Sequence, residues 1–233
     1  MTEVVRVNFA RPMPVFGLPD DVLLPHAIRA LHIFEPRDRQ MIDETLDRSG
    51  LLSMAVFETQ QWKQNFDDTP ALRPVVCVGR MVRHESLPDG RHNILLHGIC
   101  RARIERLIEP NGQRLYRLAV VRPMERVEAD PPPMDDVRNE LQSLLMCPHL
   151  KHLRCIETVT QWIDREEIST HALLELIGFA IVRDTEVRYR LLAEPDPNLR
   201  AQIIKDELNQ LSEVVCAASR QSHRRWPKGA SWN

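Results

Sequence analysis

The stretch CPHLKHLRC, residues 147–155, holds the side chains best suited to metal chemistry. It offers Cys147, His149, His152 and Cys155 within nine residues. Thiolates and imidazoles are zinc ligands, but zinc takes four of them at tetrahedral angles, and structural sites usually draw ligand pairs from separate elements. The alternative is a helix–helix corner broken by Pro148, with the thiols turned inward and the histidines exposed. We therefore keep these four residues as a weak metal candidate and predict no bound metal.

The spacing of the glycines argues against nucleotide chemistry. There are eight glycines, and no two lie closer than the eight residues that separate Gly90 from Gly98. The phosphate-binding loop G-x-x-x-x-G-K-[ST] and the dinucleotide-binding loop G-x-G-x-x-G need closer spacings, because only glycine lets the backbone approach a phosphate so closely. The serine-hydrolase motif G-x-S-x-G and the metalloprotease motif H-E-x-x-H are absent too. We predict no catalytic residues and no cofactor.

Two aromatic residues in a polar loop are the candidate contact residues. The segment ETQQWKQNFDDTPALRP, residues 58–74, lies between two predicted strands and carries Trp62 and Phe66. Aromatic side chains exposed on a loop are typical of contact surfaces. The alternative is that both rings fold back over the sheet.

The overall charge gives no support for a nucleic-acid or membrane partner. The chain has 233 residues, a formal net charge of −2 and a pI near 6.5, whereas proteins that bind phosphate backbones or anionic membranes are usually basic. The segment from Arg220, RQSHRRWPKGASWN, is basic and could contact nucleic acid through phosphates and stacking. Chain ends are commonly loose, so residues 219–233 are predicted to be a disordered basic tail.

The cysteine content and the absence of long apolar runs predict a cytoplasmic protein. The five cysteines are odd in number and form no C-x-x-C pair, which fits reduced thiols better than a disulfide framework. No apolar run approaches the ~18 residues of a membrane helix. The N-terminal residues MTEVVRVNFARP contain no continuous apolar segment of a secretory signal.

The first part of the chain, residues 1–125, is predicted to be a β subdomain. The run LHIF, residues 31–34, ends at Glu35-Pro36, where a proline suits the first turn of a helix that ends near Gly50. Turn signals such as Asn111-Gly112 separate further apolar runs. Strands are predicted over residues 51–58, 74–85, 91–98, 100–107 and 114–124.

The run CRARIERL, residues 100–107, shows the clearest strand periodicity. Cys100, Ala102 and Ile104 alternate with charged residues. This period of two predicts one buried face and one solvent face, with Arg101 and Arg103 on the solvent face.

The later part of the chain is predicted to be helical. A proline-rich acidic linker is expected over residues 126–136 and a helical subdomain over 137–218, because apolar residues there recur at helical spacing. Ser169 and Asp184 are predicted helix caps, and Asp196-Pro197 is predicted to begin the last helix. The expected fold class is α+β.

Two motifs resemble the Lon protease N-terminal, or LON substrate-binding, domain family. PVFGLPDDVLLP, residues 14–25, followed by LHIFEPRDRQM, is similar to the opening of that family. DGRHNILLHGICRARIERL, residues 89–107, is similar to its second signature, and the two occur in the family's order. The resemblance extends over about residues 12–215 and implies a PUA-like β pseudo-barrel followed by a C-terminal α-helical bundle. It also implies that Leu31 and Phe34 belong to the core.

Three positions depart from the family's pattern. Gly17 stands where a proline is usual, and His26-Ala27 stands where Pro-Gly is common. Asp38 replaces an aromatic residue. The last change either loosens the packing of the first helix or exposes a new polar group.

The resemblance implies a binding function rather than an enzymatic one. Full-length Lon proteases carry an ATPase module and a Ser-Lys peptidase domain after this region, and the glycine spacing excludes the first. We therefore expect a stand-alone, non-catalytic module that binds unfolded or extended polypeptide, with Trp62 and Phe66 as candidate contacts, and that serves protein quality control. A homo-oligomer is compatible with this reading. The alternatives are an RNA-binding PUA-like module and, less favoured, a small metal-dependent hydrolase built on residues 147–155.

Overall fold

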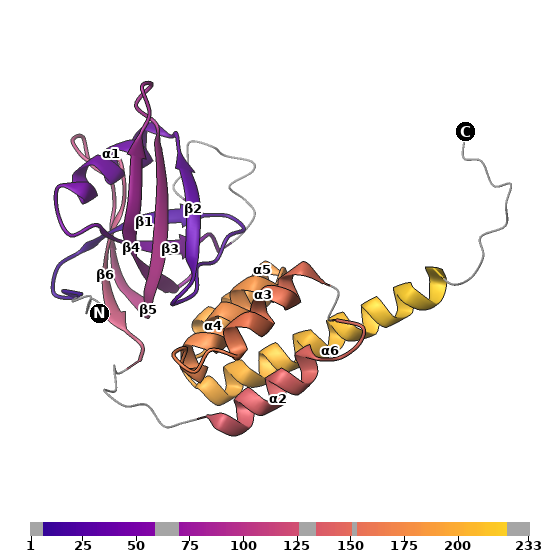
Figure 1. The fold of residues 1–233 in the computed structure, drawn as a ribbon. Coiled ribbons are helices and arrows are strands. Elements are labelled where there is room, and N and C mark those ends of the chain that lie inside the picture. The colour runs from indigo at the N-terminus through magenta and orange to yellow at the C-terminus, as the bar shows by residue number, and fades with distance from the viewer. Residues whose placement is uncertain (1–6, 59–69, 126–133, 151–152, 223–233) are drawn as a thin grey trace, which may run out of the picture.

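The computed structural model describes residues 7–58, 70–125, 134–150 and 153–222. Figure 1 shows a β-rich part and a helical part side by side. The strands are β1 (Met13–Leu18), β2 (Ile28–Ile33), β3 (Leu51–Val56), β4 (Val75–Ser86), β5 (His92–Ile108) and β6 (Leu118–Pro123). The helices are α1 (Pro36–Leu46), α2 (Asp135–Leu145), α3 (Arg154–Ile163), α4 (Thr170–Ile181), α5 (Thr185–Ala193) and α6 (Pro197–Ser222).

The six strands form one mixed sheet that closes into a pseudo-barrel. The strand order is β2-β5-β4-β3-β1-β6, and β6 also pairs with β5. Closure depends on the length of β5: its first half pairs with β2 and its second half with β6. The two strands predicted over 91–98 and 100–107 are therefore one continuous strand of 17 residues. The expected α+β fold, a β pseudo-barrel followed by helices, is confirmed.

A small hydrophobic cluster draws its buried residues from five of the six strands, all except β2. Several of its members are alanines or valines, which suit the narrow interior of a small barrel. Its buried members are Met13, Val15, Leu51, Ala55, Val76, Val78, Ala102, Ala119 and Val121.

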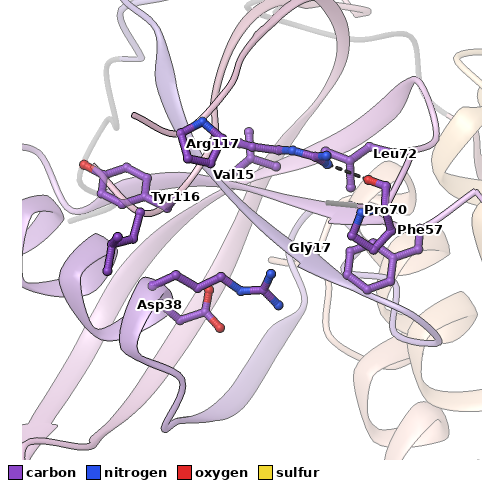
Figure 2. Close-up of a pocket in the computed structure, with 11 residues that line it drawn as sticks. Val15, Gly17, Asp38, Phe57, Pro70, Leu72, Tyr116 and Arg117 are labelled. Atoms are coloured by element: carbon purple, nitrogen blue, oxygen red, sulfur yellow. Dashed lines mark hydrogen bonds between the residues drawn. The ribbon is translucent and has the colours of Figure 1, made fainter. Parts of the chain in front are cut away.

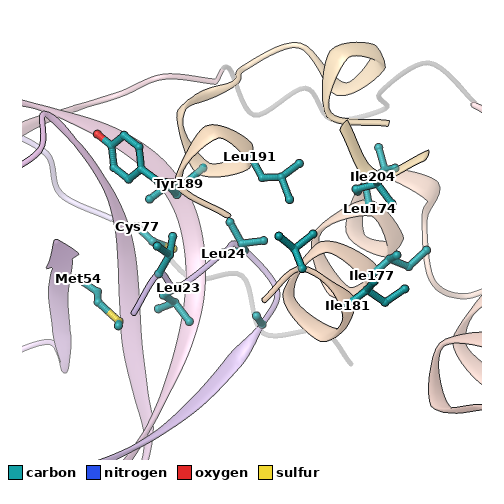
Figure 3. Packing of buried hydrophobic residues seen from close by; sticks show 14 of the residues in the cluster. Leu23, Leu24, Met54, Cys77, Leu174, Ile177, Ile181, Tyr189, Leu191 and Ile204 are labelled. Atoms are coloured by element: carbon teal, nitrogen blue, oxygen red, sulfur yellow. The ribbon is translucent and has the colours of Figure 1, made fainter. Parts of the chain in front are cut away.

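A larger cluster runs from the sheet into the helices without a break. It includes Leu52, Met54 and Cys77 of the sheet together with buried residues of α2 to α6. Figure 3 shows Leu23 and Leu24, from the segment between β1 and β2, lying between these strands and the helices. This segment therefore joins the two parts through shared apolar packing.

A close backbone contact holds this joining segment against β5. The N–H of Gly98 donates to the carbonyl of Ala27 at 2.9 Å, and the N–H of His26 donates to the carbonyl of Gly98 at 2.8 Å. His26 has a φ of 62°, the left-handed conformation that glycine favours. The turn that brings this segment onto β5 therefore holds a non-glycine residue in that conformation.

The predicted helix starts are confirmed where a side chain caps the helix. Ser169 accepts a hydrogen bond from the N–H of Ala172, and Asp184 accepts from the N–H groups of Glu186 and Val187. Helix α6 begins at Pro197 as expected, and its C-terminal end projects away from the other helices (Figure 1). Helix α3 has no side-chain cap at its N-terminus, and it was not predicted.

The expectation that Phe34 belongs to the core is wrong. Phe34 is 61% exposed, whereas the preceding Ile33 is 1% exposed. Successive side chains of a strand point to opposite faces, so the buried position of Ile33 at the end of β2 directs Phe34 outward. Leu31 is partly buried and packs against the larger cluster.

Candidate functional site

The predicted contact and metal residues are only partly covered by the structure. Trp62, Phe66 and His152 lie outside the described residues. Cys147 and Cys155 are partly buried and His149 is exposed; the thiol of Cys147 lies 3.5 Å from the hydroxyl of Ser212. Within the described ranges, no three His, Cys, Asp or Glu side chains are placed to share a metal ion. The described cysteines are all free thiols.

Two positions that depart from the family's pattern line the same small hollow. Gly17 and Asp38 both face a space of about 40 Å³ bounded by Phe57, Tyr116 and Arg117 (Figure 2). A Cβ added at Gly17 would lie 2.6 Å from the ring of Phe57. Phe57 therefore occupies the space that a proline ring would need, which accounts for the glycine.

The carboxyl group of Asp38 is partly buried at the edge of this hollow. Burial raises the pKa of Asp38 from its ordinary value of 3.8 to about 7; Arg37 opposes this rise and Glu35 adds to it. The neighbouring charges are otherwise engaged: Arg37 pairs with Glu35 at 2.7 Å, and Arg117 donates to the carbonyl of Pro70 at 2.5 Å. Asp38 therefore places a partly buried polar group beside this hollow.

This environment predicts a pH-dependent gain of stability in the variant Asp38→Asn. When the pKa of a carboxyl is raised in the folded state, its contribution to folding stability is fully present below the pKa of the unfolded state, near 3.8. That contribution is lost as the pH rises through the folded-state pKa of about 7. The variant should therefore match wild type near pH 4 and be more stable near pH 8. Because Asp38 is partly exposed, we expect the unfolding free energy to rise by about 1–2 kcal/mol, which is less than the whole pKa shift would correspond to.

Urea unfolding at both pH values measures this effect. The matched control is Asp47→Asn, at the exposed end of the same helix, where no comparable burial exists. A stability difference for Asp38→Asn that is the same at pH 4 and pH 8 would contradict the assigned environment.

The large exposed apolar side chains of the sheet gather on and near β2. Ile28, Phe34 and Val82 are 55%, 61% and 51% exposed. A hollow of about 460 Å³ lies over β2, β5 and β4 beside them and is lined by Ala30, Leu31, His32, Arg83, Asn93 and Leu95, among others. Exposed apolar side chains beside a hollow are typical of binding surfaces. We take this face, with Ile28 and Phe34, as the candidate site in the described residues.

Sequence reasoning missed this face because it placed Phe34 in the core. The signal that could have found it is the run IRALHIF, residues 28–34, in which apolar residues occur on both faces of one strand. A strand with apolar residues on both faces either is buried on both sides or exposes one of them. Strand β2 exposes one of its faces, because Ile28, Ala30 and His32 are all exposed.

A buried ionic network holds the helices against the barrel. Arg101 of β5 is 1% exposed, although strand periodicity placed it on the solvent face. Its guanidinium contacts Glu175 of α4 at 2.6 Å and Glu125 at 3.3 Å. Arg200 of α6 contacts the same two carboxylates at 3.0 and 2.7 Å. The prediction for Arg101 is wrong because the helices cover that part of the strand and supply the opposite charges.

Comparison with known proteins points to one family. Residues 12–210 match the family model described as the ATP-dependent protease La (LON) substrate-binding domain. The chain is 24% identical over 211 residues to a Lon protease of Geobacter metallireducens, an alignment covering 87% of this chain and 24% of that protein. It is 29% identical over 101 residues to Lon protease 3 of Sorangium cellulosum, covering 43% of this chain and 12% of that protein. The chain thus spans about a quarter or less of these relatives.

Solved structures share the fold. The N-terminal domain of Mycobacterium avium complex Lon protease aligns with a TM-score of 0.65 and 16% identity, covering 85% of this chain and 98% of that one. A Lon N-terminal domain protein from Xanthomonas campestris aligns with a TM-score of 0.59 and 19% identity, covering 82% of this chain and 95% of that one.

In the described part of this chain, no helix is long and apolar enough to cross a membrane.

Proposed function

The chain belongs to the LON substrate-binding domain family, and we propose from this premise that it is a non-catalytic module that binds unfolded or extended polypeptide. The observation that carries the proposal is the family match over residues 12–210, which covers the barrel and most of the helices. The domains of this family are described as substrate-binding, and the substrates of a protease are polypeptides.

The surface of the sheet supports this proposal. Ile28 and Phe34 expose apolar side chains beside an open hollow on the sheet, and such surfaces suit the apolar segments that unfolded chains present. The glycine spacing gives no phosphate-binding loop. We further propose that the chain serves as an adaptor in protein quality control, holding a polypeptide without hydrolysing ATP or peptide bonds.

Trp62 and Phe66 remain the proposed contacts outside the described residues, and one variant tests them. The double variant Trp62→Ala, Phe66→Ala should weaken binding of a chemically unfolded, fluorescently labelled protein by about tenfold or more, since aromatic contacts often carry 1–2 kcal/mol each. Equilibrium fluorescence anisotropy measures the dissociation constant.

The matched control replaces two exposed apolar residues of α6. Leu199 and Val214 are 53% and 65% exposed, and Leu199→Ala, Val214→Ala should leave binding unchanged. Binding that survives the loop substitutions at wild-type strength would remove the loop from the site. If the wild-type chain itself does not bind the unfolded protein, the proposed function is wrong.

A further inference from the structure

Strand β2 has one free edge. In the described residues it pairs only with β5, whereas every other strand of the sheet has at least two neighbours. An unpaired strand edge presents a row of N–H and C=O groups to which another strand can bind.

The register identifies which groups of β2 face outward. The N–H of Gly98 donates to the carbonyl of Ala27, and the next pair along the two strands is Ile28 with His97. Residues of an antiparallel strand direct their N–H and C=O groups alternately toward and away from the partner. Ala27 faces β5, so Ile28, Ala30 and His32 direct their backbone groups to the free edge.

The side chains beside this edge do not protect it. Strand edges in soluble proteins are usually blocked by proline, by outward-pointing charges or by a bulge. Residues 28–34 contain no proline and one charged residue, Arg29. The paired register from Ile28 to Ile33 is regular, and Ile28 and Phe34 expose apolar surface at its two ends.

The arginines on and next to β2 are already paired, which argues for an uncharged partner at its edge; Arg83 of the hollow lies on β4, on the other side of β5. Three arginines lie on or near β2, and each has a carboxylate partner within 2.7 Å. The pairs are Arg29 with Asp21, Arg37 with Glu35, and Arg91 with Asp89. A charged segment would gain no new ion pair from these side chains and would lose hydration on binding. The edge is thus complementary to a neutral, largely apolar segment.

We propose that the outer edge of β2 binds an extended, uncharged and largely apolar polypeptide segment, which joins the sheet as a further strand. This inference rests on the proposed function and adds the place and mode of binding. The backbone groups of Ile28, Ala30 and His32 supply hydrogen bonds that do not depend on sequence. The side chains of Ile28 and Phe34 select apolar neighbours.

Two substitutions at one position test the hydrogen bonds. Ala30→Pro removes the outward N–H without removing a bond to β5, and proline is accepted on the solvent side of an edge strand. Ala30→Val keeps the N–H and serves as the matched control. Binding of a labelled peptide of about nine alternating valine and threonine residues should weaken about tenfold in Ala30→Pro and change less than about twofold in Ala30→Val.

A second variant and a second readout keep the test independent of folding. Ile28→Lys with Phe34→Lys changes only exposed side chains and should also weaken binding about tenfold, because a charge at a strand edge opposes pairing. In the wild-type chain, hydrogen exchange of the Ile28, Ala30 and His32 amides should slow at least about tenfold with saturating peptide. The amides of Arg29 and Leu31, which face β5, are the internal control.

The possible outcomes distinguish a failure of this inference from a failure of the proposed polypeptide-binding function. Suppose that the wild-type chain binds the peptide but the exchange rates of the three edge amides do not change, or that the lysine variant binds as well as wild type. Binding at the β2 edge is then wrong, and the proposed function stands. If the wild-type chain binds neither the peptide nor an unfolded protein, both fail. Edge amides that are protected in the free protein, increasingly at higher concentration, would show a second copy on this edge and would also overturn the inference.

Discussion

The variant Glu175→Gln should lose about 3–5 kcal/mol of unfolding free energy, the usual cost of removing one partner from a buried ion pair. Glu175 is 3% exposed and contacts both Arg101 and Arg200. Without its charge, two buried guanidinium groups share the single carboxylate of Glu125, which is 30% exposed. For a chain of this size the loss corresponds to a fall in melting temperature of about 10 °C.

The same substitution at an exposed pair is the control. Glu140 of α2 contacts Lys205 of α6 at 2.8 Å with its side chain 57% exposed, and Glu140→Gln should cost less than about 1 kcal/mol. Replacing both members of the buried pair, as in Arg101→Met with Glu175→Leu, should cost less than Glu175→Gln alone, because no uncompensated charge remains. Urea unfolding measures these changes. Equal losses of unfolding free energy in Glu175→Gln and Glu140→Gln would contradict the stabilising role of the buried network.

Gly98→Ala should be the other strongly destabilising change, with a loss of about 3 kcal/mol or more from overpacking. An added Cβ would lie 2.2 Å from the carbonyl oxygen of Leu24 and 3.1 Å from the thiol of Cys77. The first is a backbone atom and cannot turn away, so the segment carrying Leu23 and Leu24 must move off β5. Its backbone hydrogen bonds to Gly98 and its packing between sheet and helices would weaken together.

Gly112→Ala is the matched control for this contact. An added Cβ there meets no atom within 4 Å, so its unfolding free energy should stay within about 0.5 kcal/mol of wild type. Thermal and urea unfolding of the two alanine variants measure the difference. A Gly98→Ala chain as stable as Gly112→Ala would mean that the segment before β2 does not pack on β5 as described.

Local signals in the sequence predicted much of the fold. The caps Ser169 and Asp184 and the proline at position 197 marked helix starts correctly, because each acts through its own backbone neighbourhood. Apolar runs bounded by turn signals located β3, β4 and β6 to within a few residues. The two family motifs, at residues 14–41 and 89–107, identified the barrel.

Features that depend on distant parts of the chain could not be predicted. Arg101 looked like a solvent-facing residue because its partners Glu125 and Glu175 lie 24 and 74 positions away. Phe34 looked like core because only the register of β2 on β5 shows that Ile33, its neighbour, takes the inward position. The run IRALHIF carries apolar residues on both faces of β2, but only the sheet order shows that β2 lies at the end of the sheet.

One time course tests the central claim, that this chain holds polypeptide without processing it. A chemically unfolded, fluorescently labelled protein is mixed with the full chain in the presence of ATP and magnesium, and its anisotropy is followed for hours beside a folded control. We predict a saturable rise for the unfolded protein alone, followed by a constant value. No rise, an equal rise with the folded protein, or a later fall as the labelled protein is cleaved would contradict the account.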